Sequence, residues 1–148
     1  MNPPDILTAL HNALKNSDNI SYVEDVNIHL GKVSNEPNYP AIVIDPGTKK
    51  KLSDTTGGIE NWAMTVSVIG GIKVYDESKQ IVGDANIKGL EDFENDVKKA
   101  LSEDHTLGGT CLNVSILDSS PDDGQDYPLR GFLMTIEILY RQNRTTRE

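Results

Sequence analysis

Regular alternation of apolar and polar side chains near the end of the chain most constrains its fold. In residues 130–140 the alternate apolar positions are Phe132, Met134, Ile136, Ile138 and Tyr140, and the intervening positions are Leu133, Thr135, Glu137 and Leu139. Successive side chains of a β-strand point to opposite faces, so this pattern predicts a long strand. Residues 62–69 repeat it, with Trp62, Met64, Val66 and Val68 on one side and Ala63, Thr65, Ser67 and Ile69 on the other. Two such strands predict a sheet with one buried face and one half-polar face.

Two segments have the spacing of amphipathic helices instead. The first follows Pro3 and Pro4 and runs to about Asn16, with apolar positions Ile6, Leu10, Ala13 and Leu14. The second has the inner positions Leu90, Phe93, Val97, Ala100 and Leu101 and the outer positions Glu91, Asp92, Glu94, Lys98 and Lys99. Each helix is expected to bury one face.

Three shorter segments predict further strands. Residues 23–30 alternate Val26, Ile28 and Leu30 with polar residues, residues 39–45 are a compact apolar run, and residues 111–117 alternate again. A turn region from Gly31 to Asn38 joins the first two. Gly70 and Gly71 predict a bend or bulge where the long strand of residues 62–69 ends.

These elements together indicate the class of fold. Two helices cannot cover both faces of a five-stranded sheet, so we expect an α+β fold: a mostly antiparallel or mixed sheet of about five strands, with two helices packed on one face. The length of 148 residues fits a single domain, residues 1–148. The uncovered face must meet water or another subunit.

Polar segments interrupt this plan. Residues 46–60 are rich in turn formers and contain Lys49, Lys50 and Lys51, and we expect a flexible loop there. Residues 118–128 are predicted to form an acidic loop with Asp118, Asp122, Asp123 and Asp126. From about residue 142 the chain is expected to be disordered, and its end is basic through Arg141, Arg144 and Arg147.

Composition excludes some classes of function. The net charge of −9 disfavours nucleic acid as a principal ligand. The single cysteine, Cys111, cannot form an internal disulfide, and we expect it to be a small core residue in a protein of a reducing cytosol. No segment resembles a secretion signal or a membrane span.

The pair Gly108–Gly109 has two readings. Glycines that cradle a phosphate lie between a strand and the N-terminus of a helix, whereas this pair follows a helix and precedes a strand. We therefore expect a turn that needs positive φ angles, and we interpret Gly57 and Gly58 in the same way.

Other chemistry-bearing residues do not form a known constellation. The histidines His11, His29 and His105 lack metal-ligand spacing, and the segment 121–126 lacks the alternating ligands and closing glutamate of a calcium loop. No serine lies in a Gly-x-Ser-x-Gly motif, and Trp62 and Phe132 fit core or interface positions better than ligand platforms. We predict no catalytic residue, no metal and no cofactor.

The order of these elements resembles the tail terminator, or tail completion, proteins of long-tailed bacteriophages and prophages. The resemblance covers residues 6–14, 39–45, 62–70, 89–116 and 131–144. Its most characteristic part is the second helix running into Asp-x-Thr-Leu-Gly-Gly, at residues 104–109, followed by a strand; the closing strand ends in Tyr140-Arg141.

The resemblance implies a structural part of a virion rather than an enzyme. Such proteins form rings, commonly of six subunits, that cap the tail tube, stop its growth and form the docking surface for the head. The implied partners are copies of the chain, the tail tube protein and a head-completion or connector protein. DNA passes through the channel without specific binding, and no membrane is involved. The implied location is the head-proximal end of the virion tail, after assembly in the host cytoplasm.

Candidate contact residues follow from the half-polar strand faces and the charged segments. Cyclic assemblies need two complementary patches on each subunit. The candidates for contacts with other subunits or with the tube are Lys49, Lys50, Lys51, Thr65, Ser67, Asp122, Asp123, Asp126 and Glu137. Simple solvation of both charged segments is the competing interpretation. Two further alternatives stay open: a head–tail joining (neck) or minor tail protein, and a small α+β enzyme or ligand-binding domain.

Overall fold

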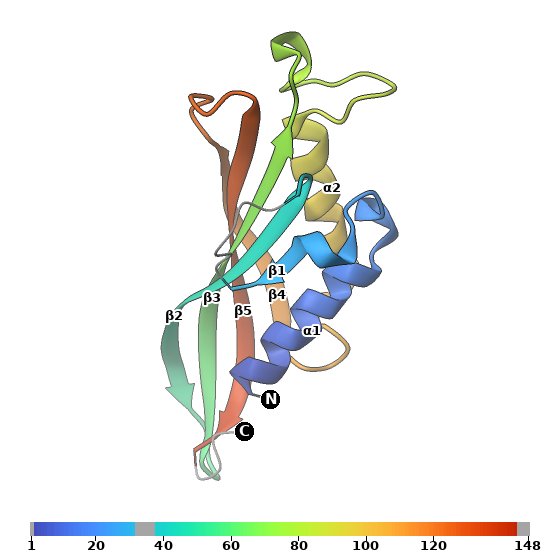
Figure 1. Ribbon diagram of the computed structural model, residues 1–148. Helices are drawn as coiled ribbons and strands as arrows, with labels where there is room; N and C mark the ends of the chain where they lie inside the picture. Colours follow the sequence, from blue (N-terminus) through green and yellow to red (C-terminus); the bar gives the residue numbers. More distant parts are fainter. Residues whose placement is uncertain (1, 32–37, 145–148) are drawn as a thin grey trace.

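The computed structural model describes residues 2–31 and 38–144, and in them two α-helices lie on one face of a five-stranded sheet (Figure 1). The elements are α1 (Pro3–Asn16), β1 (Ile28–Leu30), β2 (Ala41–Asp54), β3 (Ile59–Lys73), α2 (Leu90–Ser102), β4 (Asn113–Pro121) and β5 (Leu129–Asn143). The strand order is β1-β2-β3-β5-β4. Only β1 and β2 pair in parallel, and the other pairs are antiparallel. The predicted α+β class, with a mixed sheet, is confirmed.

Local chemistry explains where both helices begin. The amide N–H of Asp5 donates to Oδ1 of Asn2, the N-cap of α1, and the prolines occupy the first turn, where their missing N–H costs nothing. In α2, Glu91 and Asp92 stand in the first turn, where the helix dipole favours negative charge. The two helices lie on the same face of the sheet (Figure 1), and their apolar residues belong to one core cluster with those of the strands.

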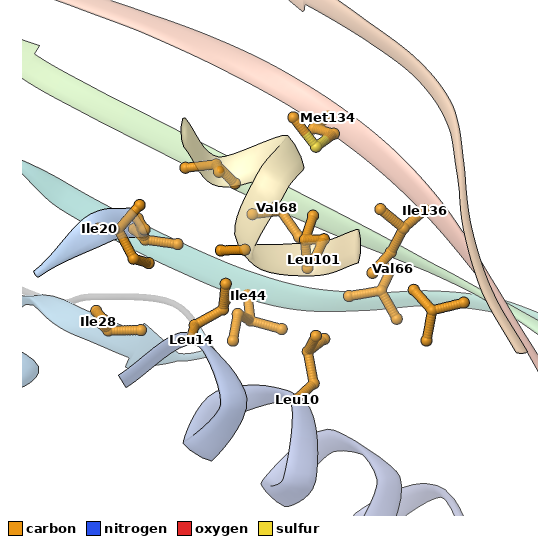
Figure 2. Packing of buried hydrophobic residues seen from close by; sticks show 14 of the residues in the cluster. Leu10, Leu14, Ile20, Ile28, Ile44, Val66, Val68, Leu101, Met134 and Ile136 are labelled. Carbon is orange, nitrogen blue, oxygen red and sulfur yellow. The ribbon is translucent and has the colours of Figure 1, made fainter. Parts of the chain in front are cut away.

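The alternation of the two long strands is confirmed. Figure 2 shows Leu10 and Leu14 of α1 and Leu101 of α2 pointing toward the sheet. The side chains that meet them are Ile44, Val66, Val68, Met134 and Ile136, all fully buried. One sheet face and two helix stripes thus form a single hydrophobic core.

The predicted strand of residues 23–30 and the predicted outward position of Glu94 were both wrong. Residues 23–30 do not form one strand, because only Ile28–Leu30 is extended; Val26 lies in a 3₁₀ turn and is 74% exposed. Leu30 is also exposed, because it is the last residue of the short edge strand β1, whereas Ile28 at the start of β1 is buried in the core. On α2, Glu94 is buried rather than outward, and its carboxylate is paired with Lys98 (3.2 Å).

The prediction of a flexible loop near 46–60 was also wrong. Residues 46–54 extend β2 and β3 begins at Ile59, so only a short turn separates the two strands. Side chains 45–54 are all exposed, which removes the apolar alternation that identifies a strand from sequence. The segment is nevertheless a strand, because its backbone pairs with that of β3.

Gly70 and Gly71 produce no bulge. The register of β3 with β5 runs unbroken from Ile59 to Lys73. A Cβ at Gly70 would lie 2.3 Å from the ring of Phe132 and 3.0 Å from the ring of Phe93. These rings stack edge to face with centroids 5.5 Å apart, so the glycine makes room for an aromatic pair.

The end predicted to be disordered is partly described. Gln142 and Asn143 belong to β5, which contradicts disorder from residue 142. Arg147 lies outside the described residues, as does most of the predicted turn region between Gly31 and Asn38.

Candidate assembly surface

The sheet face opposite the helices is the surface that the fold leaves uncovered, and we call it the open face (Figure 1). Its central strands contribute Ala63, Thr65, Ser67 and Ile69 of β3 and Leu133, Thr135, Glu137 and Leu139 of β5. Most of these side chains are half-buried by their neighbours in the sheet. The open face is therefore a mixed surface, apolar at some cross-strand rows and polar at others.

An apolar pair lies toward the end of the sheet where β5 begins. Ile69 and Leu133 stand directly opposite one another on β3 and β5, and they are 40% and 45% exposed. Val43 of β2 extends the same row. Burying such a row would favour association by about 25 cal/mol for each Å² of apolar surface covered.

A polar centre follows along the same strands. Glu137 stands opposite Thr65 on one side and Ser115 of β4 on the other, and Ser67 stands opposite Thr135. Thr65 is occupied within the chain: the amide N–H of Thr48 donates to its Oγ1 (3.0 Å), and the hydroxyl donates to the carbonyl of Thr48 (3.3 Å). Glu137 and Ser67 have no ion pair or side-chain hydrogen bond among the residues that the structure describes.

The three lysines of β2 differ in their environments. Lys51 is paired with Asp54 (3.2 Å) and lies 3.8 Å from the buried carboxylate of Glu60, which Arg144 also approaches. Lys49 and Lys50 are exposed and make no ion pair within residues 2–31 and 38–144. Two bulges flank the run, between Pro46 and Lys49 and between Lys51 and Ser53. Lysines, a proline and bulges on an edge strand also discourage pairing with a foreign strand, so this run protects the edge whatever else it contacts.

The acidic loop predicted for residues 118–128 is shorter than expected, because residues 118–121 belong to β4 and pair with β5. The remainder is a turn closed by its own side chains. Oδ1 of Asp122 accepts a hydrogen bond from Nε of Arg130 (2.6 Å), and its Oδ2 accepts one from the amide N–H of Gly131 (2.9 Å). Asp123 accepts a bond from the amide of Gln125, and Asp126 is exposed. Asp122 therefore has a structural role, whereas Asp126 and part of Asp123 are open to solvent.

The structure does not bring the lysine run and the acidic turn together within one chain. The acidic turn joins β4 to β5 at the end of the sheet where β5 begins, whereas the lysines lie toward the tip of the β2–β3 hairpin at the opposite end (Figure 1). Opposite charges thus mark opposite ends of the strands.

The Gly108–Gly109 pair forms a turn, as predicted. The φ angles are +48° at Leu107, +70° at Gly108 and +86° at Gly109. Asp104 accepts hydrogen bonds from the amide of Gly108 (2.7 Å) and from the amide and hydroxyl of Thr106. These bonds lower the pKa of the Asp104 carboxyl. Because this carboxylate already occupies the amide groups, the turn is no anion cradle.

Cys111 is a core residue, as predicted. It is 2% exposed, and burial raises the pKa of its thiol to about 11. A thiol with such a pKa is protonated near neutrality and is a poor nucleophile. The Nε2–H group of His11 donates to the carbonyl oxygen of Ile28 (2.7 Å). His29 lies on β1, and His105 lies in the turn after α2.

A hollow of about 610 Å³ lies between the loop 84–88 and the adjoining ends of β2 and β3. Two of its ionisable groups form ion pairs: Asp84 with Lys79 (2.9 Å), and Lys88 with Asp96 (3.0 Å). Lys73 and Asp92 also line it. The pairing with Lys79 and two backbone amides lower the pKa of Asp84 to about 2. Burial and the neighbouring Asp96 raise the pKa of Tyr22. With these shifted pKa values, neither the Asp84 carboxyl nor the Tyr22 hydroxyl is suited to proton transfer near neutral pH.

Within the described residues, no three His, Cys, Asp or Glu side chains gather as they would around a metal ion. Among the helices of that same part of the chain, none has the length and apolarity needed to cross a bilayer.

Two exposed leucines were not predicted from the sequence. Leu52 of β2 and Leu117 of β4 are 54% and 52% exposed, and each is the additional residue of a β-bulge. No sequence signal identifies a bulge of this kind, because it depends on the register between two strands.

Comparisons with known proteins identify the fold. No protein-family model matches the sequence, and no curated protein matches it. Among solved structures, a chain of the virion of a native gene transfer agent particle has a similar fold, with a TM-score of 0.64. The match covers 91% of this chain and 93% of that chain at 7% sequence identity. The chain therefore shares its whole architecture with a chain of a virion particle, and the likeness is one of fold.

Proposed function

We propose that this protein is a structural component of a phage-like virion, and that it caps the tail tube as a ring of identical subunits. The observation that carries the proposal is the fold likeness to a virion chain over nearly the full length of both chains. The order of elements and the Asp-x-Thr-Leu-Gly-Gly turn, which resemble tail terminator proteins, supply the finer assignment. The ring stops tube polymerisation and offers its outer surface to the head. Its partners are copies of itself, six in a ring, the tail tube protein and a head-completion or connector protein.

The open face supports a role in assembly. A monomer that leaves Ile69 and Leu133 in water gains apolar burial when another subunit covers that face. Glu137 lies two cross-strand rows farther along the same face. Ser67 lies in the same region. Lys49 and Lys50 at one end, and Asp123 and Asp126 at the other, offer unlike surfaces to neighbours or to the tube.

Non-enzymatic action agrees with the chemistry of the sites. Asp84 and Lys88 of the hollow are ion-paired, and the Cys111 thiol is buried. The net charge of −9 suits a channel wall that does not retain DNA. The protein acts in the virion, at the head-proximal end of the tail, after assembly in the host cytoplasm.

Polymerising tail tubes test the proposal directly. Purified protein is added to tube protein during polymerisation, and tube lengths and ends are measured by negative-stain electron microscopy. We expect shorter, uniform tubes with density capping one end. Unchanged lengths together with bare ends would overturn the proposed role.

Single charge reversals examine the basic patch. We expect K49E and K50E to weaken capping at moderate ionic strength, while K99E, which reverses an exposed lysine on α2, leaves capping unchanged. All three should keep their stability within about 0.5 kcal/mol, because exposed charges contribute little to folding. Equal capping by K50E and K99E would remove the lysine run from the interface.

A head–tail joining (neck) protein is the second candidate. The fold likeness to a virion chain supports it as well as it supports the tube cap. Binding to isolated head connectors without any effect on tube growth would select this candidate over the tube cap.

A further inference from the structure

The two outer edges of the sheet carry the same unusual feature. On β2, Lys51 and Ser53 pair with the consecutive residues Trp62 and Asn61, so Leu52 is an additional residue between them. On β4, Ile116 and Asp118 pair with the consecutive residues Ile136 and Thr135, and Leu117 is additional. Each edge strand therefore places a leucine in a one-residue bulge.

Both leucines are exposed at edges that no other described strand covers. β1 pairs only with residues 42–44 of β2, which leaves Leu52 beyond its reach. β4 pairs with β5 alone and is the last strand of the sheet on its side. More than half of each leucine side chain lies in water. A bulge interrupts the regular ladder that a foreign strand would need, and it re-aims the side chain of the additional residue.

The charges beside the two leucines have opposite signs. Leu52 follows Lys49, Lys50 and Lys51, whereas Leu117 precedes Asp118. Lys50 and Asp118 are exposed, and neither has an ion pair among the described residues. Because β2 and β4 are on opposite sides of the sheet centre, these two edges are different surfaces that face away from one another.

We propose that the β2 edge of one copy packs beside the β4 edge of the next copy, with Leu52 against Leu117 and Lys50 near Asp118. The contact is made by side chains, not by adding a strand to the sheet. It rests on the proposed function in one respect. A contact between two different edges of identical chains repeats from copy to copy, and the ring of the proposed function is the closed form of that repeat. The partner is a second copy of this chain, because the chain itself supplies the complementary leucine and charge.

Disulfide trapping tests this contact. L52C and L117C are made in a background in which Cys111 is replaced by alanine, and the two proteins are mixed under mild oxidation. We expect a covalent dimer of L52C with L117C at least tenfold above that formed by either protein alone. The doubly substituted chain should give a ladder of higher oligomers. V26C, at an exposed position of a 3₁₀ turn, mixed with L52C is the control for random collision.

Each outcome has a definite meaning. Dimers of L52C with L117C no more abundant than those of L52C with V26C would overturn the proposed contact, and so would preferred dimers of L52C with itself. A charge exchange adds a second measurement. K50E in the L52C chain, or D118K in the L117C chain, should reduce trapping when it is present alone. Mixing L52C that carries K50E with L117C that carries D118K should restore trapping. Circular dichroism confirms that each variant is folded before it is used.

The wild-type tube assay separates this contact from the proposed function. Tubes capped by wild-type protein, with no specific trapping, would leave the function standing and remove the contact. Specific trapping with uncapped tubes would establish self-association through these edges and remove the terminator role.

Discussion

The ring of Phe132 occupies the space into which a side chain at position 70 would project: a Cβ on Gly70 would lie 2.3 Å from Cε1 of Phe132. Phe132 is itself held by Phe93 of α2 in an edge-to-face contact. Gly70 is therefore a point where the central sheet and α2 come together.

Gly70→Ala is expected to destabilise the fold strongly. The added methyl must displace buried rings, and overpacking of a core typically costs about 1–3 kcal/mol. Urea unfolding at pH 7 measures the loss. F132L in the same chain should recover part of it, whereas S67A on the open face should change stability by less than about 0.5 kcal/mol. An alanine at 70 as stable as the wild type would show that the rings move freely.

Asp104→Ala is expected to lower stability in a pH-dependent manner. The folded state lowers the pKa of this carboxyl below its ordinary value of 3.8, so its contribution is fully present above that value. As pH falls through the lowered pKa the carboxyl gains a proton and the contribution disappears. The difference between wild type and D104A, measured by urea unfolding, should be clear at pH 7 and shrink at the lowest pH at which both remain folded. D45A, at an exposed carboxylate of β2, is the control and should change stability at pH 7 by less than about 0.5 kcal/mol.

Cys111 is expected to react slowly with thiol reagents in the folded protein. Raising the pKa from the ordinary 9.0 to about 11 reduces the thiolate fraction about a hundredfold, and burial adds a steric barrier. Absorbance after addition of an aromatic disulfide follows the reaction. The rate should rise at least hundredfold in denaturant. Rapid labelling of the native protein would contradict the buried position.

Glu60→Ala is expected to destabilise the end of the sheet where β2 turns into β3 and β5 ends. Glu60 is 3% exposed, and its carboxylate faces Lys51, Arg144 and the indole N–H of Trp62 (3.4 Å). Both cations can reach water after the change, so we expect a loss of about 1–2 kcal/mol, near the lower end for a buried charged hydrogen bond. Fluorescence of Trp62, the single tryptophan, reports the change locally.

Asp54→Ala is the matched control for Glu60. Asp54 contacts the same cations, at 3.2 Å from Lys51 and 3.0 Å from Arg144, but its carboxylate is exposed. Exposed pairs contribute about 0–1 kcal/mol. Equal losses from E60A and D54A would show that burial of Glu60 adds nothing.

Most residues of the candidate assembly surface could be named from the sequence, but their contacts within the folded chain could not be predicted. Alternation alone placed Ser67 and Glu137 on the half-polar face, and the charges of Lys49 and Asp126 were evident. That Thr65 bonds to Thr48, and that Asp122 bonds to Arg130, depends on residues brought together by folding. Glu94 was expected outside because helical spacing ignores what the neighbouring elements cover.

By itself, the sequence determined which apolar side chains of β3, β5, α1 and α2 form the core, and that the chain turns at Gly108. These features are local: side-chain periodicity follows from strand and helix geometry, and the turn is closed by Asp104 four residues away. Only the tertiary structure decided that residues 46–54 are a strand, that Gly70 faces Phe132, and that Leu52 and Leu117 occupy bulges. The physical reason is that backbone pairing and strand register are set by partners distant in sequence, and no local pattern of side chains records them.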